Sequence, residues 1–240
     1  MKNLIIATVV ASFSFGAAGA ETIRLGTEGA YPPYNFINDA GEIDGYEREL
    51  GDAICAAAKL ECIWVKNDWD SIIPNLVSGN YDAIIAGMSI TAERDEVIDF
   101  TQEYFPPDPS GYMGMAGTKV DLKGGIIAAQ VNTVQAAYVA ESGATLVEFA
   151  TPDETIAAVK NGEADAVLAD LAYLDQFVKE SNGTLAFVGE VSIGGGIGLG
   201  VRESDTALKN TFDMAITSLK ADGTVTKLIA KWFDGRVANY

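Results

Sequence analysis

The sequence contains no histidine among its 240 residues. Catalytic Ser-His and Cys-His pairs are therefore excluded, and so is the side chain that most often binds transition metals. Catalysis by carboxylates alone remains open, because the chain carries 34 Asp and Glu residues. We expect neither a metal site nor a bound cofactor.

Basic residues are also scarce. There are 16 Lys and Arg against the 34 acids, which gives a net charge of −18. Nucleic acids and anionic membrane surfaces are bound through basic patches, so neither is an expected partner. A negative field would attract a cationic small molecule, although acidity that serves only solubility gives the same composition.

Long apolar runs are missing after the first 20 residues. The chain begins with Met1-Lys2-Asn3, continues with a mostly apolar run from Leu4 to Phe15, and reaches the small residues Ala18-Gly19-Ala20. This layout predicts a secretory signal peptide over residues 1–20, cleaved after Ala20. An N-terminal anchor helix is the alternative, but the run is short for a span of about 20 residues. We therefore expect a protein secreted into the periplasm.

The chain has only two cysteines, Cys55 and Cys62. Disulfides persist in exported proteins. A helix that ends near Lys59 and a strand that starts near Glu61 could bring the two thiols together. We favour a structural disulfide over two free thiols.

Strand-like and helix-like segments alternate along the chain, which predicts parallel or mixed sheets covered by helices. The expected strands are Ile23–Thr27, Cys62–Val65, Asp82–Ala86, Gly111–Met115, Gly125–Ala129 and Ala164–Ala169, with Ile193–Val201 extended. The expected helices are Tyr46–Lys59, Ser71–Ser78, Thr133–Glu141, Asp153–Lys160, Asp205–Lys220 and Thr224–Phe233.

One pattern occurs twice. Residues 77–86 (VSGNYDAIIA) and 160–169 (KNGEADAVLA) share Gly-x-x-Asp-Ala followed by two apolar residues and Ala. Each copy ends a predicted helix, turns at a glycine and enters a short apolar strand. The repeat favours two lobes of similar build, although turns of this kind are common in α/β proteins.

The residues that follow the two copies carry opposite charges. The first copy runs on to Ser89, Thr91 and Arg94, and the second ends at Asp170. In open α/β sheets, ligands bind beyond the carboxyl ends of strands. An arginine pairs with a carboxylate through two hydrogen bonds, and a carboxylate accepts from an ammonium. The pair would hold both ends of an α-amino acid, unless the two residues are solvated surface charges.

With these motifs in order, the mature chain resembles the polar amino-acid periplasmic binding proteins, solute-binding protein family 3, which serve ABC importers. It looks closest to the branch that binds histidine, lysine/arginine/ornithine and opines. The motifs that carry the resemblance are Gly26-Thr-Glu-Gly-Ala-Tyr-Pro-Pro-Tyr34, Gly45-Tyr-Glu47, Trp69-Asp-Ser-Ile-Ile-Pro74, Tyr81-Asp-Ala-Ile84, Met88-Ser-Ile-Thr91 with Arg94, Ala164-Asp-Ala-Val167 and Asp222-Gly-Thr224.

The resemblance implies how the two ends of the ligand are bound. In similar proteins the ligand α-carboxylate binds an arginine and a serine, which fall on Arg94 and Ser89. The α-ammonium binds an aspartate, which falls on Asp170, and carbonyl groups that lie here around Gly87.

It also implies how the ligand side chain is bound. Aromatic rings at the positions of Tyr31 and Trp69 stack along it, and an acid at the position of Glu28 meets a distal cation. A second acid, at the position of Glu47, supports the first. The paired cysteines of the family coincide with the two cysteines of this chain.

Two departures from the family pattern concern the pocket. The anion loop of the second lobe usually reads Gly-Thr-Thr or Gly-Ser-Thr, but here it is Asn132-Thr133-Val134. The following helix still offers backbone N–H groups to a carboxylate, so Thr133 and Val134 both remain candidates for ligand contact. In the first lobe, Ala86 and Gly87 stand where relatives often have serines, which leaves the pocket less polar.

Charge counting then narrows the ligand. Arg94 and Asp170 balance the zwitterion, and Glu28 is left over. Because a buried carboxylate without a partner is costly, a cationic side chain such as that of lysine, arginine or ornithine is expected to match it. If Glu28 is solvated instead, histidine, an opine or a neutral polar amino acid would fit.

The expected fold is α/β and two-lobed, with a mixed sheet flanked by helices in each lobe. Lobe 1 is expected over residues 21–106 and 201–240 and lobe 2 over residues 107–200, joined by hinge strands near Tyr104–Ser110 and Gly198–Arg202. Hinge closure on the ligand would be the signal that the membrane permease of an importer reads. We expect a monomer that binds its ligand without transforming it. A dehydratase on the same fold and the sensing domain of a receptor are the alternatives.

Overall fold

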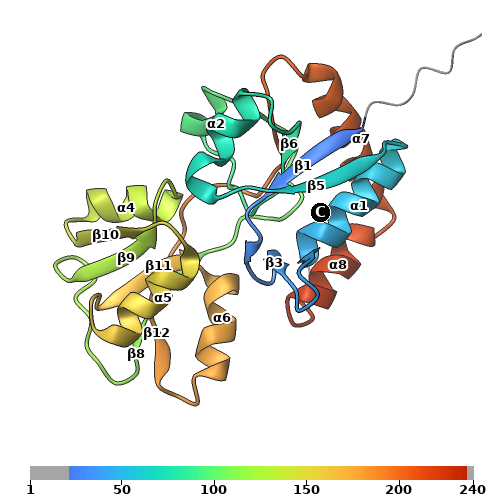
Figure 1. Ribbon diagram of the computed structural model, residues 1–240. Helices are drawn as coiled ribbons and strands as arrows, with labels where there is room; N and C mark the ends of the chain where they lie inside the picture. Colours follow the sequence, from blue (N-terminus) through green and yellow to red (C-terminus); the bar gives the residue numbers. More distant parts are fainter. Residues whose placement is uncertain (1–21, 237–240) are drawn as a thin grey trace, which may run out of the picture.

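A computed structural model describes residues 22–236 (Figure 1). The expected signal peptide, residues 1–20, lies outside the described part of the chain. The described residues form two lobes, each built on a five-stranded sheet with helices on both faces. This arrangement confirms the predicted two-lobed α/β fold.

The first lobe holds a mixed sheet in the order β5-β1-β6-β13-β7. Strand β1 runs parallel to β5 and β6, whereas β13 runs antiparallel to β6 and β7. The strands are β1 (Ile23–Thr27), β5 (Cys62–Lys66), β6 (Ala83–Ile84), β7 (Asp99–Phe100) and β13 (Gly200–Val201). A small antiparallel sheet of the same lobe contains β2 (Ala30–Tyr31), β3 (Asn35–Ile37) and β4 (Ile43–Asp44).

The second lobe repeats this plan in the order β10-β9-β11-β8-β12. Strand β9 runs parallel to β10 and β11, and β8 runs antiparallel to β11 and β12. The repeated sequence pattern supplies the third strand of each sheet, β6 and β11. The strands are β8 (Ser110–Met115), β9 (Ile126–Gln130), β10 (Thr145–Phe149), β11 (Ala166–Asp170) and β12 (Leu185–Val191).

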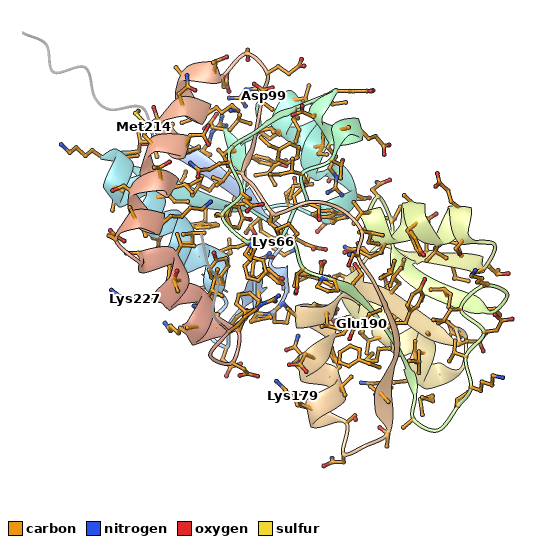
Figure 2. All side chains as sticks on the ribbon, turned by 180° about the vertical axis from the view of Figure 1, so that it is seen from behind. Lys66, Asp99, Lys179, Glu190, Met214 and Lys227 are labelled. Atoms are coloured by element: carbon orange, nitrogen blue, oxygen red, sulfur yellow. A yellow bond between two sulfur atoms is a disulfide. The ribbon has the colours of Figure 1, made fainter. Side chains whose placement is uncertain are left out.

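Helices cover both faces of each sheet. In the first lobe α1, α7 and α8 pack together on one face and α2 lies on the other (Figure 1). Figure 2 shows Met214 of α7 and Lys227 of α8 on this helical layer, and Lys179 and Glu190 on the second lobe. The helices are α1 (Tyr46–Ala58), the 3₁₀ helix η1 (Trp69–Ser71), α2 (Ile72–Val77), α3 (Ala92–Asp95), α4 (Val134–Ser142), α5 (Pro152–Asn161), α6 (Leu171–Glu180), α7 (Thr206–Ala221) and α8 (Thr224–Trp232).

Local sequence explains where several of these helices begin and end. Helix α1 buries Tyr46, Leu50 and Ile54, which recur every four residues on one face. Helix α5 begins with a capping box, in which Thr151 and Glu154 each bind the other's backbone N–H. It ends at a glycine in the left-handed region, and both features agree with the helix predicted at this position.

Three elements of the second lobe were absent from the prediction. Helix α6 starts directly after β11, with no glycine or proline to signal a turn. Strand β10 is an edge strand without fully buried residues, and β12 is interrupted by a bulge between Phe187 and Gly189. The turns at Gly143 and Gly183 that precede β10 and β12 could have indicated both strands, whereas α6 has no such signal.

The chain passes between the lobes twice. The first passage connects β7 with β8. The second follows β12, and Ile197 then forms isolated bridges with Ser89 and Phe105, so this residue lies with the first lobe. The expected lobe boundary at residue 200 stays a prediction, and these bridges favour a return to the first lobe a few residues earlier.

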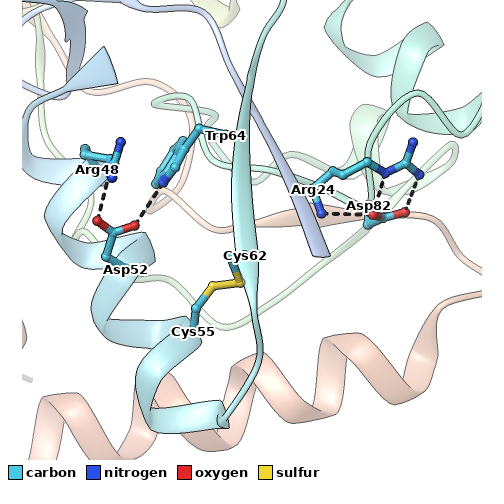
Figure 3. Close-up of a disulfide and its surroundings, with 7 residues drawn as sticks. All are labelled: Arg24, Arg48, Asp52, Cys55, Cys62, Trp64 and Asp82. Atoms are coloured by element: carbon cyan, nitrogen blue, oxygen red, sulfur yellow. Dashed lines mark hydrogen bonds and ion pairs between the residues drawn. A yellow bond between two sulfur atoms is a disulfide. The ribbon is translucent and has the colours of Figure 1, made fainter. Parts of the chain in front are cut away.

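Cys55 and Cys62 form a disulfide between α1 and the start of β5 (Figure 3). The expected pairing of the two cysteines is thereby confirmed. Figure 3 also shows Asp52 of α1 accepting hydrogen bonds from Arg48 and from the indole of Trp64 on β5. The covalent bond and the Trp64–Asp52 hydrogen bond join the helix to the edge strand of the first sheet.

We predict that replacing both cysteines by alanine lowers the free energy of unfolding by about 2 kcal/mol, because a cross-link over a short loop restricts the unfolded chain. Urea denaturation of the wild type and the variant at pH 7 measures the difference. Reducing the wild-type disulfide should give the same loss. Superimposable unfolding curves would show that the disulfide does not stabilise the fold.

Within residues 22–236, none of the helices combines the length and the apolarity needed to span a bilayer. The same part of the chain contains no group of three or more acids or cysteines placed to hold a metal ion.

Candidate ligand-binding site

A cavity lies between the two lobes, with about 350 Å³ not filled by protein atoms when the space open to solvent is included. Its wall combines charged, amide, hydroxyl and aromatic groups from both halves of the chain. The lining residues are Glu28, Tyr31, Trp69, Ala86, Gly87, Ser89, Arg94, Gln130, Thr133, Val134, Gln135 and Asp170.

The carboxyl ends of parallel strands from both sheets lie at this cavity. Glu28 follows β1 and Ala86 follows β6, whereas Gln130 and Asp170 are the last residues of β9 and β11. Ligand sites in open α/β sheets form at such strand ends. The site is therefore assembled from equivalent positions of two similar lobes.

Arg94 is fixed by contacts on both sides of the cavity. Its Nη1 donates to the carbonyl oxygen of Ser89 at 2.8 Å, and its Nη2 donates across the lobes to the carbonyl oxygen of Asn132 at 3.1 Å. The guanidinium lies over the ring of Trp69, 5.5 Å from its centroid. Burial lowers the pKa of Arg94 to about 10, so the side chain stays cationic at neutral pH. A partly buried cation held in this way is suited to bind a carboxylate.

Asp170 presents a carboxylate from the second lobe. Its Oδ2 accepts a hydrogen bond from the Tyr31 hydroxyl at 2.9 Å, and its Oδ1 accepts from Nε2 of Gln135 at 3.2 Å. The Tyr31 ring stacks on Tyr173 with centroids 4.1 Å apart. Burial raises the pKa of Asp170 to about 6, and the hydrogen bond from Tyr31 and the charge of Arg94 counteract the rise. The carboxylate therefore gains from any further cationic donor that enters the cavity.

Glu28 is a second buried carboxylate, contributed by the first lobe. It is 5% exposed, and its Oε1 accepts from Nε2 of Gln130 in the second lobe at 2.6 Å. Burial raises the pKa of Glu28 to about 7, although the hydrogen bond from Gln130 and the charge of Lys66 lower it. No cation of the described chain forms an ion pair with Glu28.

Glu47 lies behind the cavity wall and is not among its lining residues. It is fully buried and accepts hydrogen bonds from the backbone N–H of Gly87 at 2.7 Å, from Asn35 at 2.7 Å and from the hydroxyl of Tyr104. The φ of Gly87 is +63°, in the left-handed region that favours glycine. Glu47 thus holds the backbone at Gly87, and its expected support of Glu28 stays a prediction.

The first turn of α4 forms another part of the wall. Thr133 caps this helix: its hydroxyl accepts from the N–H of Ala136 at 3.1 Å and donates to the carbonyl oxygen of Gln130 at 2.7 Å. The hydroxyl hydrogen is therefore already engaged. Backbone N–H groups of the first turn are the donors that remain for an anion, which favours Val134 as the contributor from this loop.

The other predicted residues also lie on the wall. Trp69 precedes α2 and is almost fully buried, and its indole Nε1 has no hydrogen-bond partner within residues 22–236. Ala86, Gly87 and Ser89 follow β6. Of the eleven residues proposed from sequence for ligand binding, Glu47 alone is missing from the lining. Their roles toward a ligand stay predictions.

The prediction missed two glutamines that line the cavity, Gln130 and Gln135. Both lie within two residues of the loop Asn132-Thr133-Val134, in which the family pattern indicates a hydroxyl group and not an amide. Gln130 has one sequence signal that could have been used: it is the last residue of an apolar strand, the same kind of position that pointed to Asp170.

The arrangement has three charged groups in one small, buried cavity. Arg94 offers hydrogen-bond donors to an anion, and Asp170 offers acceptors to a cation. Glu28 adds a second acceptor for a cation, from the same lobe as Arg94. The site therefore matches a small molecule with one anionic and two cationic groups. It contains no nucleophile activated by a neighbouring base among the lining residues.

Comparisons with known proteins place this chain in a family. Bacterial extracellular solute-binding proteins, family 3, match residues 23–235. ABC transporter arginine-binding protein 1 of Escherichia coli K12 is 32% identical over 241 residues, which cover 97% of this chain and 99% of the relative. The lysine/arginine/ornithine-binding periplasmic protein of the same strain is 32% identical over 251 residues, which cover 98% and 96%.

A solved structure is more similar still. It is a periplasmic His/Glu/Gln/Arg/opine family-binding protein from Silicibacter pomeroyi in complex with lysine. It is 68% identical in sequence and superposes with a TM-score of 0.88, covering 91% of this chain and 100% of the other.

Proposed function

Because the chain belongs to the bacterial extracellular solute-binding proteins, family 3, we propose that it captures a basic L-amino acid and delivers it to an ABC importer. Lysine, arginine and ornithine are the candidate ligands. A relative of 68% identity holds lysine, and relatives of 32% identity are named for arginine and for lysine/arginine/ornithine.

The observation that carries this proposal is the excess of one carboxylate in the cavity. Arg94 would bind the ligand α-carboxylate, and Asp170 would bind the α-ammonium. Glu28 is then buried with only a neutral hydrogen-bond donor, the amide of Gln130. A second cation on the ligand would remove the cost of ionising Glu28 in a buried site.

Closure of the lobes would complete the site, because its groups come from both. Tyr31 supports this view, since it packs against the apolar core of each lobe and its hydroxyl bonds Asp170 across the cavity. We propose that the closed form is the state that the permease recognises. We further propose that the protein acts as a monomer in the periplasm after removal of residues 1–20.

Isothermal titration calorimetry on protein that has been unfolded, dialysed and refolded tests the proposal. We expect one molecule of lysine, arginine or ornithine to bind per chain, and norleucine and glutamate to bind at least a hundredfold more weakly. Two charge-assisted contacts of roughly 1.5–3 kcal/mol each, with ring stacking, are sufficient for a site of micromolar Kd. Absence of binding by all three basic amino acids would refute the proposed ligand class.

The fate of the ligand distinguishes a binding protein from the enzymatic alternative, a dehydratase. The bound molecule is released by denaturing the complex after a long incubation and is identified by mass spectrometry. We expect the amino acid to be recovered unchanged, because Arg94 and Asp170 line one cavity and together would bind the two charged ends of an amino acid. A mass lower by one water would establish a dehydratase.

The raised pKa values of Glu28 and Asp170 predict opposite pH dependences for stability and for ligand affinity. Folding raises the pKa of Glu28 from 4.5 to about 7, so the protonated group favours the folded state. This contribution to stability is complete below pH 4.5 and is lost as the pH rises through 7. Asp170 behaves likewise between 3.8 and about 6. The ligand-free protein should therefore be less stable at pH 8 than at pH 5, by on the order of 2 kcal/mol.

Affinity for lysine should change in the other direction, because the cation binds the ionised carboxylates. We expect it to fall as the pH drops from 8 to 5. Thermal unfolding of the free protein and calorimetric titration over this range measure both slopes. Parallel slopes, or no slope in either quantity, would contradict the assignment.

A further inference from the structure

Gln130 closes one end of the cavity from the second lobe. It is the last residue of β9, its side chain is almost fully buried, and its amide crosses to Glu28 in the first lobe at 2.6 Å. The same Nε2 donates to the carbonyl oxygen of Ala150 at 3.1 Å. Gln130 therefore joins the two lobes at the group that would receive the distal cation of the ligand.

The chemistry of its neighbours fixes the orientation of this amide. A carboxylate oxygen and a backbone carbonyl oxygen are both acceptors, so the NH₂ group of Gln130 must face them. Its carbonyl oxygen Oε1 points away from them and accepts no hydrogen bond from any residue within 22–236. A neutral acceptor without a partner thus sits beside the carboxylate of Glu28, on a residue that lines the cavity.

A terminal ammonium and a guanidinium make different demands on such a pair. An ammonium is a compact charge whose three donors diverge, so it benefits from acceptors on separate groups. A guanidinium is planar and longer, and it favours the two oxygens of a single carboxylate. Gln130 already donates to Oε1 of Glu28, so a guanidinium that used both oxygens of this carboxylate would compete with the amide.

We propose that Gln130 is a specificity-determining residue, which selects a ligand with a terminal ammonium, lysine or ornithine, over one with a guanidinium. The inference rests on the proposed function. Glu28 supplies the negative charge and Oε1 of Gln130 supplies a second acceptor. Since the two residues belong to different lobes, the ammonium is held fully only after closure.

The test compares Gln130→Leu with the wild type in calorimetric titrations of lysine, ornithine, arginine and norleucine. Leucine has a similar size and retains neither donor nor acceptor. We expect lysine and ornithine to lose at least tenfold in affinity while arginine changes less, so that the lysine-to-arginine ratio of affinities falls at least tenfold. Gln130→Met serves as a second variant if the first does not fold, as judged by its thermal unfolding.

Gln176→Leu is the matched control. Gln176 lies on α6 and also donates across the lobes, to the carbonyl oxygen of Pro32 at 3.0 Å, but it does not line the cavity. Loss of an interlobe hydrogen bond alone should change the affinities of all ligands by the same factor.

An unchanged lysine-to-arginine ratio in both Gln130 variants would overturn the inference and leave the proposed function intact. Failure of the wild-type protein to bind any basic amino acid would instead refute the proposed function itself. A ratio that falls in the Gln176 variant as much as in the Gln130 variants would show that closure, not the Gln130 amide, sets the preference.

Discussion

Asp170→Asn is expected to weaken binding of a basic amino acid at least a hundredfold. Asparagine keeps the shape of the side chain and can still accept the hydrogen bond from Tyr31. It removes the negative charge that would face the ligand α-ammonium. Truncating one partner of a buried charge pair typically costs 2–5 kcal/mol, since the other charge is left without its partner. Calorimetric titration of the refolded variant with lysine measures the loss.

The thermal stability of the variant distinguishes a lost ligand contact from unfolding. Burial raises the pKa of Asp170 to about 6, so ionising this carboxyl group near neutral pH already opposes folding of the ligand-free protein. Asp170→Asn should therefore unfold at the same temperature as the wild type at pH 8, or at a higher one. A variant that lost both stability and affinity would point to a structural role.

Asp165→Asn provides the matched control. Asp165 immediately precedes β11, at the opposite end of the strand from Asp170, and its carboxylate accepts the backbone N–H of Ile126 at 2.8 Å. The substitution makes the same change of net charge outside the cavity. It should leave the affinity for lysine within a few-fold of the wild-type value.

Arg94→Ala is expected to have a similarly large effect, by removing the donors to the α-carboxylate. Arg48→Ala, which removes a cation from the outer surface of α1, should not change binding. Affinity within tenfold of the wild type in either cavity variant would contradict the assignment of the two ligand ends.

The positions of Arg94 and Asp170 could be expected from sequence because two local rules combine. A repeated helix-glycine-strand pattern predicted equivalent strands, and ligand sites form at strand carboxyl ends. The structure places these strands third in each sheet, and both residues line one cavity. The resemblance to a known family then added Glu28, Tyr31 and Trp69.

The contacts within the site could not be predicted in the same way. Tyr31 and Asp170 are 139 residues apart, and Tyr31 packs against the core of each lobe. No local pattern encodes such a pairing. Gln130 was missed for a related reason. Its amide belongs to the site only through its hydrogen bond to Glu28 of the other lobe, and no local pattern indicates that contact. The sequence indicated which strand ends form the site, and the packing of the lobes decided which side chains meet.

The same limit applies to secondary structure in the second lobe. Helix α6 was missed although its residues are good helix formers, because β11 passes into it without a breaking residue. Its position matters for the site. Tyr173 of α6 stacks on Tyr31, and Gln176 bonds the backbone of Pro32, so one helix carries two of the contacts that hold the lobes together.

Glu28→Gln is expected to remove most of the preference of the site for cationic over neutral ligands. The distal cation of lysine would lose its carboxylate partner, and we expect a loss of about 3 kcal/mol, or roughly a hundredfold in affinity. Norleucine has the same chain without the terminal charge. Its affinity should stay constant or increase, because the variant no longer pays the cost of an unpaired buried carboxylate beside an apolar chain.

The free protein provides an independent readout of the same substitution. Burial raises the pKa of Glu28 to about 7, so the glutamine variant should unfold at a higher temperature than the wild type at pH 8, and the two should converge toward pH 5. Glu42→Gln, at an exposed position of the same lobe, makes the same charge change and should alter neither quantity. If Glu28→Gln lost the same factor of affinity for lysine and for norleucine, this carboxylate would support the cavity wall and would not recognise the ligand. A loss of affinity confined to lysine, together with the gain in stability at pH 8, would show two things. The ionised Glu28 destabilises the ligand-free protein, and a cationic ligand compensates for that cost.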